Sequence, residues 1–335
     1  MTISSFGDLS LSLQLRRDSA RVTSDLARIT SELSRGVVSD VAGQLRGDFS
    51  SLAGFENSLA RLDGFRSVIQ EQTLFLSTQQ DVMQKLRDIG SVSISFLTLP
   101  SLTNSAFLDN VGAEARLAFD AALRALNTQV GGRSVFSGVE TNQPTVAEPD
   151  VMLTAIEADI ALAGATRATD IEAVVDTWFD VGGGFETIGY LGGPGFTTAL
   201  QLSDTEVVQL SITGGNEAIR DQLAALSLAA LVGRGNTASP IEEQVELLQR
   251  SGEKLLASNE QLVNLQARVG NVEASVGRAS AEISAQRDAL QLAKSELIEV
   301  DPFKAATELQ NAETQLQTIY TLTSRLSQLS LVNFL

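Results

Sequence analysis

Five acidic side chains in the middle of this 335-residue sequence are the residues best suited to chemistry. They are Asp176, Asp180, Glu186, Asp204 and Glu206. Carboxylates of this kind could work as a catalytic pair or supply oxygen ligands to calcium. Their spacing does not follow an EF-hand loop, and a solvated acidic surface explains them at least as well. Catalysis and metal binding are therefore kept only as alternatives.

A glycine-rich segment at 189–195 could suggest a phosphate-binding loop. It lacks the Gly-Lys-Ser/Thr ending of a P-loop, and it lacks the Gly-x-Gly-x-x-Gly fingerprint of dinucleotide-binding proteins. The sequence contains no cysteine and no histidine, which excludes thiolate or histidine metal sites and Ser-His-Asp or Cys-His nucleophiles. We therefore expect no catalytic site and no cofactor.

The net charge of -17 argues against a nucleic-acid partner, because phosphate binding needs clustered Lys and Arg. Most of this charge lies at 140–235, which holds 14 acidic and 3 basic residues. The first ten residues have neither the basic nor the apolar part of a cleaved signal peptide, and no apolar run reaches the length of a membrane span. Taken alone, these features predict a cytoplasmic protein, although export without signal cleavage leaves no such mark.

Proline and paired glycines are concentrated in the centre of the chain, and the flanks contain long stretches without proline. This distribution is typical of long helices on either side of a middle segment that contains many turns. The C-terminal flank, 240–300, carries large aliphatic residues at every seventh position, a coiled-coil-like seam. These are Leu248, Leu255, Leu262, Val269, Val276, Ile283, Leu290 and Leu297. The Ser-Pro-Ile-Glu sequence at 239–242 predicts the start of this helix, and Asp301-Pro302 predicts its end or a new cap.

The N-terminal flank repeats the pattern, with helices expected at 10–35, 55–90 and 110–129. In the middle, helical periodicity predicts helices at 151–163, 169–181 and 216–232, with Trp178 as a core residue. Short apolar runs predict strands at 185–188, 196–202 and 206–212. The fold class is therefore mainly α, with long paired terminal helices in a coiled-coil-like bundle and a small inserted α+β domain.

Four stretches carry a family resemblance. They are 34–43 (SRGVVSDVAG), 132–141 (GRSVFSGVET), 265–273 (LQARVGNVE) and 299–309 (EVDPFKAATEL), the last with the chain end 330–335 (SLVNFL). Together they resemble the bacterial flagellin family, and within it the hook-associated proteins that join hook to filament. Three departures stand out. Asp40 is a single aspartate where the family often has two, Val37-Val38 replaces a more basic pair, and Pro302 lies where relatives usually continue a helix.

The resemblance implies a structural protein of the bacterial flagellum, not an enzyme, located outside the cell at the hook–filament junction. It implies export through the flagellar type III channel without a cleaved signal. As partners it implies further copies of the chain in a ring or helical array, the hook-side hook-associated protein, flagellin and an export chaperone, with no membrane and no nucleic acid. The terminal helices would pair with each other and with neighbours, and the inserted domain would face outward.

We accordingly expect terminal polymerisation helices at 1–45 and 302–335, a helical-bundle domain at 46–139 and 236–301, and an inserted outer domain at 140–235. The terminal helices are weakly apolar, so each is marginal alone and needs a partner. The expected assembly interface consists of Leu15, Val22, Leu26, Ile29, Leu33, Leu309, Leu316, Ile319, Leu326, Leu331 and Leu335. Each of these could instead belong to the core of a single subunit.

Three alternatives remain open at this point. The first is a filament flagellin, against which the 132–141 stretch and the modest middle domain favour the junction protein. The second is a secreted enzyme or effector on a flagellin-like scaffold, which would need a site at 140–235. The third is a cytoplasmic coiled-coil adaptor.

Overall fold

A computed structural model describes residues 4–99, 104–193, 200–203, 206–208, 212–235 and 240–332, with side chains described throughout except at 4–9, 200 and 327–332. Long helices packed on one another make up most of the described chain, so the predicted mainly α fold is confirmed. The chain forms two compact units, 1–63 with 284–335 and 64–283. These limits fall inside long helices, whereas the sequence placed the boundaries near 45 and 302.

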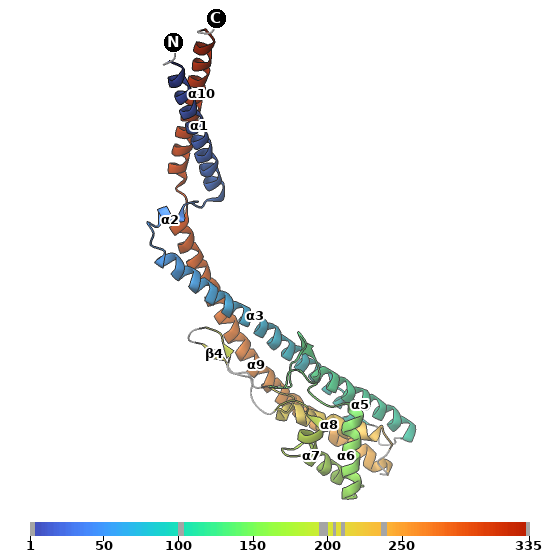
Figure 1. Cartoon of the computed structure of the whole chain (residues 1–335). Helices are drawn as coiled ribbons and strands as arrows, with labels where there is room; N and C mark the ends of the chain where they lie inside the picture. The colour runs from blue at the N-terminus through green and yellow to red at the C-terminus, as the bar shows by residue number, and fades with distance from the viewer. Residues whose placement is uncertain are drawn as a thin grey trace. The chain divides into compact units, whose positions relative to one another are not determined.

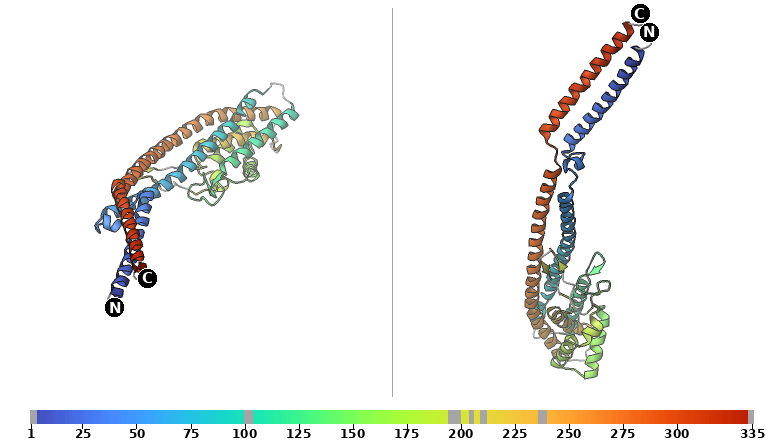
Figure 2. Two further views of the ribbon diagram at one scale, coloured as in Figure 1. Left: turned by 90° about the horizontal axis from the view of Figure 1, so that it is seen from above. Right: turned by 60° about the vertical axis from the view of Figure 1, so that its left-hand side comes forward.

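The first unit joins the two ends of the chain. Helix α1 (Ser4–Arg35) and helix α10 (Pro302–Val332) lie side by side, with both termini at the same end of the pair (Figures 1 and 2). A short helix α2 (Val41–Gln44) follows α1. The unit also holds the beginning of α3 (Ser50–Gly90) and the end of α9 (Ile241–Ile298), which two exposed ion pairs connect. In these pairs Arg287 lies 2.7 Å from Asp63 and Lys294 lies 2.9 Å from Glu56.

The heptad seam of α9 is buried over most of its length. The first six aliphatic positions, from Leu248 to Ile283, are all less than 4% exposed, while Leu290 and Leu297 are half-buried. On α3, burial likewise deepens from a half-buried Phe55 to a fully buried Met83. The seven-residue spacing therefore marks the face along which these helices bury their side chains, as predicted.

The second unit is a helical bundle that holds the rest of α3 and α9. Its further helices are α4 (Ser93–Leu97), α5 (Ser105–Leu126), α6 (Pro149–Ala163), α7 (Ala168–Phe179), the π-helix η1 (Phe185–Gly189) and α8 (Glu217–Val232). Its strands form two antiparallel pairs, β1 (Gln129–Val130) with β2 (Arg133–Ser134) and β3 (Leu200–Gln201) with β4 (Val207–Val208).

Helix α8 lies at the centre of this bundle. It is apolar nearly all round, which is the pattern of a helix buried on every side. It packs on α5, α6 and α7. The Ser251 hydroxyl on α9 donates to the Ala225 carbonyl at 2.6 Å, and the buried Gln222 amide donates to the Leu86 carbonyl on α3. The sequence grouped 216–232 with the inserted domain, but its packing makes it the core of the bundle.

The predicted strand at 185–188 is wrong, because these residues form η1. Phe185 is fully buried against Trp178 and Phe179, and a short apolar run does not distinguish a strand from a buried helical turn. The predicted strands at 196–202 and 206–212 contain β3 and β4, respectively. Residues 196–199 and 209–211 of these predictions lie outside the described residues. The helices predicted at 151–163, 169–181 and 216–232 correspond to α6, α7 and α8.

Two glycines let α5 and the end of α8 touch. A Cβ atom at Gly112 would lie 2.5 Å from the Gly233 Cα, too close for any side chain to fit without movement of the backbone. We therefore predict that Gly112→Ala destabilises the bundle by about 1–3 kcal/mol in urea unfolding, through overpacking.

The matched control is Gly277→Ala on α9, where the new Cβ would meet nothing within 4 Å. This change should stabilise the protein by up to ~1 kcal/mol, because alanine is the better helix former. A Gly112→Ala variant as stable as the parent would contradict the close contact.

Candidate assembly interface on the terminal helices

The chain changes direction twice in the first unit, and the two turns are hydrogen-bonded to each other. The Val38 amide donates to the Ile298 carbonyl at 3.0 Å, and the Val300 amide donates to the Gly36 carbonyl at 3.1 Å. Gly36 ends α1 with a φ of 71°, a conformation that glycine adopts without strain. We call 36–38 with 298–300 the joint. It ties the base of α1 to the point where α9 gives way to α10.

A buried glutamate reinforces the joint. Glu32 is 5% exposed, accepts a hydrogen bond from the Ser39 amide at 2.9 Å, and pairs with Arg28 at 3.0 Å. Burial acts to raise the pKa of Glu32, but the Ser39 amide and the Arg28 guanidinium outweigh it and hold that pKa below its ordinary value. The carboxylate therefore stays charged and fixes the turn after α1.

Asp301 and Pro302 begin α10 as a helix cap. The Asp301 carboxylate accepts hydrogen bonds from the amides of Phe303 and Lys304, at 2.9 and 3.1 Å. Proline at the first helical position has no amide that would need a partner. The prediction that these two residues end one helix and cap another is confirmed. Asp40 caps α2 in the same way, through the Gly43 amide at 2.9 Å.

The seam between α1 and α10 is shallow. Among the described side chains of the two helices, the buried apolar ones are Val22, Ile29, Ala305 and Ala312. Two of these four are alanines, so the pair buries little apolar surface for helices of 32 and 31 residues. Helices of this kind draw most of their stability from the packing of an amphipathic face.

The predicted interface residues divide by burial. Val22 and Ile29 are buried in the seam, each 3% exposed. Half-buried positions are Leu15, Leu26, Leu309, Leu316, Ile319 and Leu326. Leu33 is exposed, the side chain of Leu331 is not described, and Leu335 lies outside the described residues. The pairing of α1 with α10 thus buries two residues of this set and leaves the other described members partly or fully open to solvent.

Other large apolar side chains on the two helices point to solvent. They are Leu11, Leu13, Phe303, Tyr320 and Leu322. Phe303 is the most exposed, at 86%. The sequence analysis did not assign these residues to the interface because it followed one stripe per helix. Apolar residues outside that stripe were the signal that could have identified them.

A groove runs along the pair and is lined by Leu26 and Leu316 together with small residues of α1, namely Thr23, Ala27, Thr30, Ser31 and Ser34. The charges of the two helices nearly cancel, because α1 has five basic and four acidic residues and α10 has two of each. A helix of another molecule could therefore approach this groove without strong like-charge repulsion.

Three backbone amides of the glycine-rich segment are already bonded to carbonyls. The amides of Tyr190, Leu191 and Gly193 donate to the carbonyls of Phe185, Thr145 and Ser137 at 2.6, 2.9 and 3.0 Å. Backbone amides already committed in this way cannot form an anion-binding loop.

Two of the five acidic candidates, Asp176 and Glu186, make structural contacts. Asp176 pairs with Lys254 at 2.7 Å, and the Glu186 carboxylate accepts from the Gly182 amide at 3.0 Å. Asp204 lies outside the described residues. In the described part of the chain, no three acidic side chains gather closely enough to hold a metal ion. Nor does any described helix combine the length and apolar character needed to cross a bilayer.

The four stretches identified in the sequence all lie at contacts between elements. Stretches 34–43 and 299–309 form the joint and the cap of α10. In 132–141, the Val135 carbonyl accepts from the Gln79 amide at 3.2 Å. In 265–273, Gln266 on α9 bonds to Gln80 and Arg87 on α3, at 3.0 and 3.1 Å. These stretches therefore carry packing roles.

Comparison with known proteins gives one family match and similar solved structures. Residues 254–335 match the family described as the bacterial flagellin C-terminal helical region. The crystal structure of Bacillus cereus FlgL is similar, with 15% identity and a TM-score of 0.50, over 72% of this chain and 100% of that one. A Vibrio parahaemolyticus structure, described as a flagellar hook-associated protein, matches at 12% identity and a TM-score of 0.40, over 76% and 95%. No curated protein matches the sequence.

The joint generates a prediction about Glu32. Replacing it by alanine removes the acceptor of the Ser39 amide and should cost about 1–3 kcal/mol locally, seen as lower hydrogen-exchange protection at Ser39 and Val38. The control Glu56→Ala removes an exposed pair with Lys294 and should change protection by less than ~1 kcal/mol.

Glu32 also makes the stability of the turn after α1 depend on pH. Because the pKa of Glu32 is lowered by folding, its stabilisation is present above the pKa of an unfolded glutamate and is lost as pH falls through the lowered value. The Ser39 protection factor should therefore fall on acidification through that window in the parent protein and not in Glu32→Ala. Equal protection in both proteins at neutral pH would contradict the role of Glu32.

Proposed function

We propose that this flagellin-like chain is the structural subunit that joins hook to filament in the bacterial flagellum, and that it assembles through its terminal helices. The observation that supports this most is the α1–α10 pair, which carries apolar side chains both in its seam and on its outer surface. Exposed apolar residues gathered on one element mark a surface for protein association. The flagellin match covers α10 and the C-terminal part of α9.

Assembly is coupled to the ordering of the terminal helices. The α1–α10 seam buries four described apolar side chains, whereas α8 alone buries eleven apolar residues. The terminal pair is therefore the part of the chain that gains most from further partners, and neighbouring copies supply the missing apolar contacts. The proposed interface combines two sets of residues. One is the eleven residues predicted from the sequence, and the other is the five exposed apolar residues Leu11, Leu13, Phe303, Tyr320 and Leu322.

The chain works without catalysis. Its partners are further copies of itself in a ring or helical array, a hook-side hook-associated protein, flagellin on the filament side and an export chaperone. It reaches the outside of the cell through flagellar type III export, without cleavage of a signal. The expected terminal helices, helical bundle and outward inserted domain remain part of this proposal.

A filament flagellin is the second candidate, because the matching family is described as a flagellin region. Deletion of the gene separates the two functions. For a junction protein, the deletion strain should lack filaments and release unpolymerised flagellin into the medium, because the filament has no base. Intact filaments of reduced number or altered composition in that strain would contradict the junction role and favour a filament subunit.

Substitutions of outward apolar residues test the assembly surface. We predict that Phe303→Ser with Tyr320→Ser leaves monomer stability within about 0.5 kcal/mol, because both side chains are exposed. The same double variant should lose self-association in sedimentation measurements and should fail to restore filaments in a deletion strain.

The matched control is Ile94→Ser on α4, a side chain of similar exposure to Tyr320 that lies in the other unit. It should assemble as the parent does. Normal assembly of the double variant, or equal loss in the control, would contradict an interface on the terminal helices.

A further inference from the structure

Helix α6 has two apolar faces. Met152, Leu153, Ile156 and Ile160 are buried in the bundle. On the opposite side, Val151, Ala155, Ala158 and Leu162 follow one another at intervals of four, three and four residues, which places them in one line along the helix. Val151 is 50% exposed and Leu162 is 88% exposed. We call this line of four residues the α6 strip.

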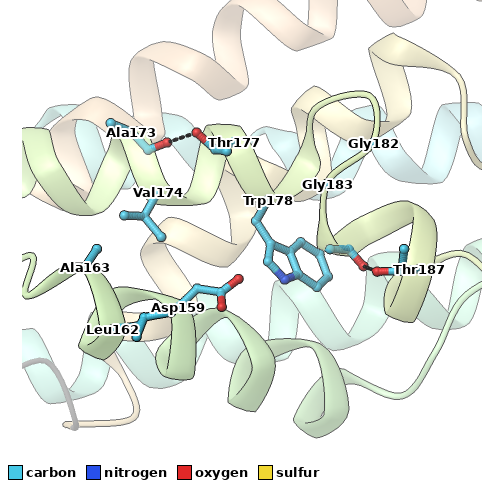
Figure 3. Close-up of a pocket in the computed structure, with 11 residues that line it drawn as sticks. Asp159, Leu162, Ala163, Ala173, Val174, Thr177, Trp178, Gly182, Gly183 and Thr187 are labelled. Atoms are coloured by element: carbon cyan, nitrogen blue, oxygen red, sulfur yellow. Dashed lines mark hydrogen bonds between the residues drawn. The ribbon is translucent and has the colours of Figure 1, made fainter.

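Two hollows border the α6 strip. One contains Val151, Ala155 and Ala158 together with Ile188 of η1. The other, of about 620 Å³, is lined by Leu162 and Asp159 of α6, by Val174 and Trp178 of α7, and by the glycines that follow α7 (Figure 3). The strip and its hollows thus form a shallow apolar channel along an outer helix.

Trp178 lies in the wall of this channel and carries a hydrogen-bond donor without a partner in the described residues. Its side chain is 2% exposed, and its indole Nε1 has no partner in the described part of the protein. Buried indole N–H groups usually find an acceptor. A Cβ atom at Gly184 would lie 2.0 Å from Nε1, so bare glycine backbone forms the wall beside it. This backbone covers Nε1, so Trp178 contributes its apolar ring to the wall of the hollow.

The charge around the channel is strongly negative. Residues 140–193 hold ten acidic side chains and one basic side chain. Four of these carboxylates pair with basic residues from outside the segment. Glu172 lies 2.8 Å from Arg250 and Asp176 lies 2.7 Å from Lys254, while Asp150 and Glu157 lie 3.1 and 2.9 Å from Arg234. Asp159 is in none of the ion pairs within the described residues, and its exposed carboxylate borders the hollow beside Trp178 (Figure 3).

This charge selects the occupant. An anionic lipid surface, a nucleic acid or the same face of a second copy would bring like charges together, which is unfavourable. A basic amphipathic helix fits both features, because its apolar face can lie on the α6 strip while its Lys or Arg residues reach Asp159. We propose that the α6 strip and the hollow at Trp178 bind a basic amphipathic helix of a partner protein.

Trp178 is the single tryptophan of the chain, so it reports on this site alone. The probe is a dansyl-labelled synthetic peptide of about 18 residues, five helical turns, with leucine and alanine on one face and lysine on the other. Added to the full-length protein, it should give saturable energy transfer from Trp178. A peptide of the same composition with the periodicity scrambled, and one with glutamate for lysine, should each bind at least about tenfold more weakly.

Variants locate the site. Leu162→Ser and Asp159→Lys should each weaken binding at least about tenfold, a difference of about 1.4 kcal/mol. Their matched controls, Leu292→Ser on α9 and Asp81→Lys on α3, change an exposed leucine and an exposed aspartate elsewhere and should leave binding within about twofold. Circular dichroism verifies that each variant is folded.

Three results would overturn the proposal. They are an absence of energy transfer, equal binding of the scrambled or acidic peptide, and equal weakening by the control variants. The proposal does not rest on the function of the terminal helices, and its failure would leave that function intact.

Discussion

Two helices from opposite ends of the sequence share a seam in which two of the four buried apolar side chains are alanine. This limited burial leaves the α1–α10 pair dependent on contacts beyond its own seam. A pair of helices more than thirty residues long holds together weakly on such a seam. The joint compensates at one end only, where main-chain hydrogen bonds and Glu32 fix the turns. Beyond the joint, the described parts of α1 and α10 keep apolar side chains exposed to solvent.

The second unit, in contrast to the α1–α10 pair, buries many apolar side chains. Its central helix α8 is enclosed by α3, α5, α6, α7 and α9, and a glycine contact brings α5 and the end of α8 together. This unit is stable by its own core, and its negative charge lies mainly on the segment around α6 and α7. The chain thus combines a self-sufficient bundle with nearly neutral terminal helices. Such a division is consistent with the proposed assembly through the terminal helices.

Much of the fold could be predicted because the helices are long and periodic. The seven-residue series from Leu248 and the Asp301-Pro302 cap gave α9 and the start of α10 from spacing and capping chemistry alone. The π-helix at 185–189 could not be predicted, because its burial depends on Trp178 and Phe179 of another helix. The central position of α8 was missed for a similar reason, since the five helices that enclose it are spread along the sequence from α3 to α9.

The candidate interface was predicted in part. Val22 and Ile29 lie in the seam, as their stripe suggested. Glu32 could not be distinguished from a surface glutamate, because its role depends on a turn that bends the Ser39 amide back toward it. The outward residues Phe303 and Tyr320 fall outside the heptad stripe. Their exposure becomes visible only when the partner helix is in place.

Hydrogen exchange of the free subunit and of the assembled form tests the central claim most directly. In the free subunit, amides of α1 and α10 near the chain ends should exchange much faster than those of α8, because the shallow seam opens locally. After assembly they should become protected to a level near that of α8. Terminal helices as protected as α8 in the free subunit, or unchanged on assembly, would contradict the account.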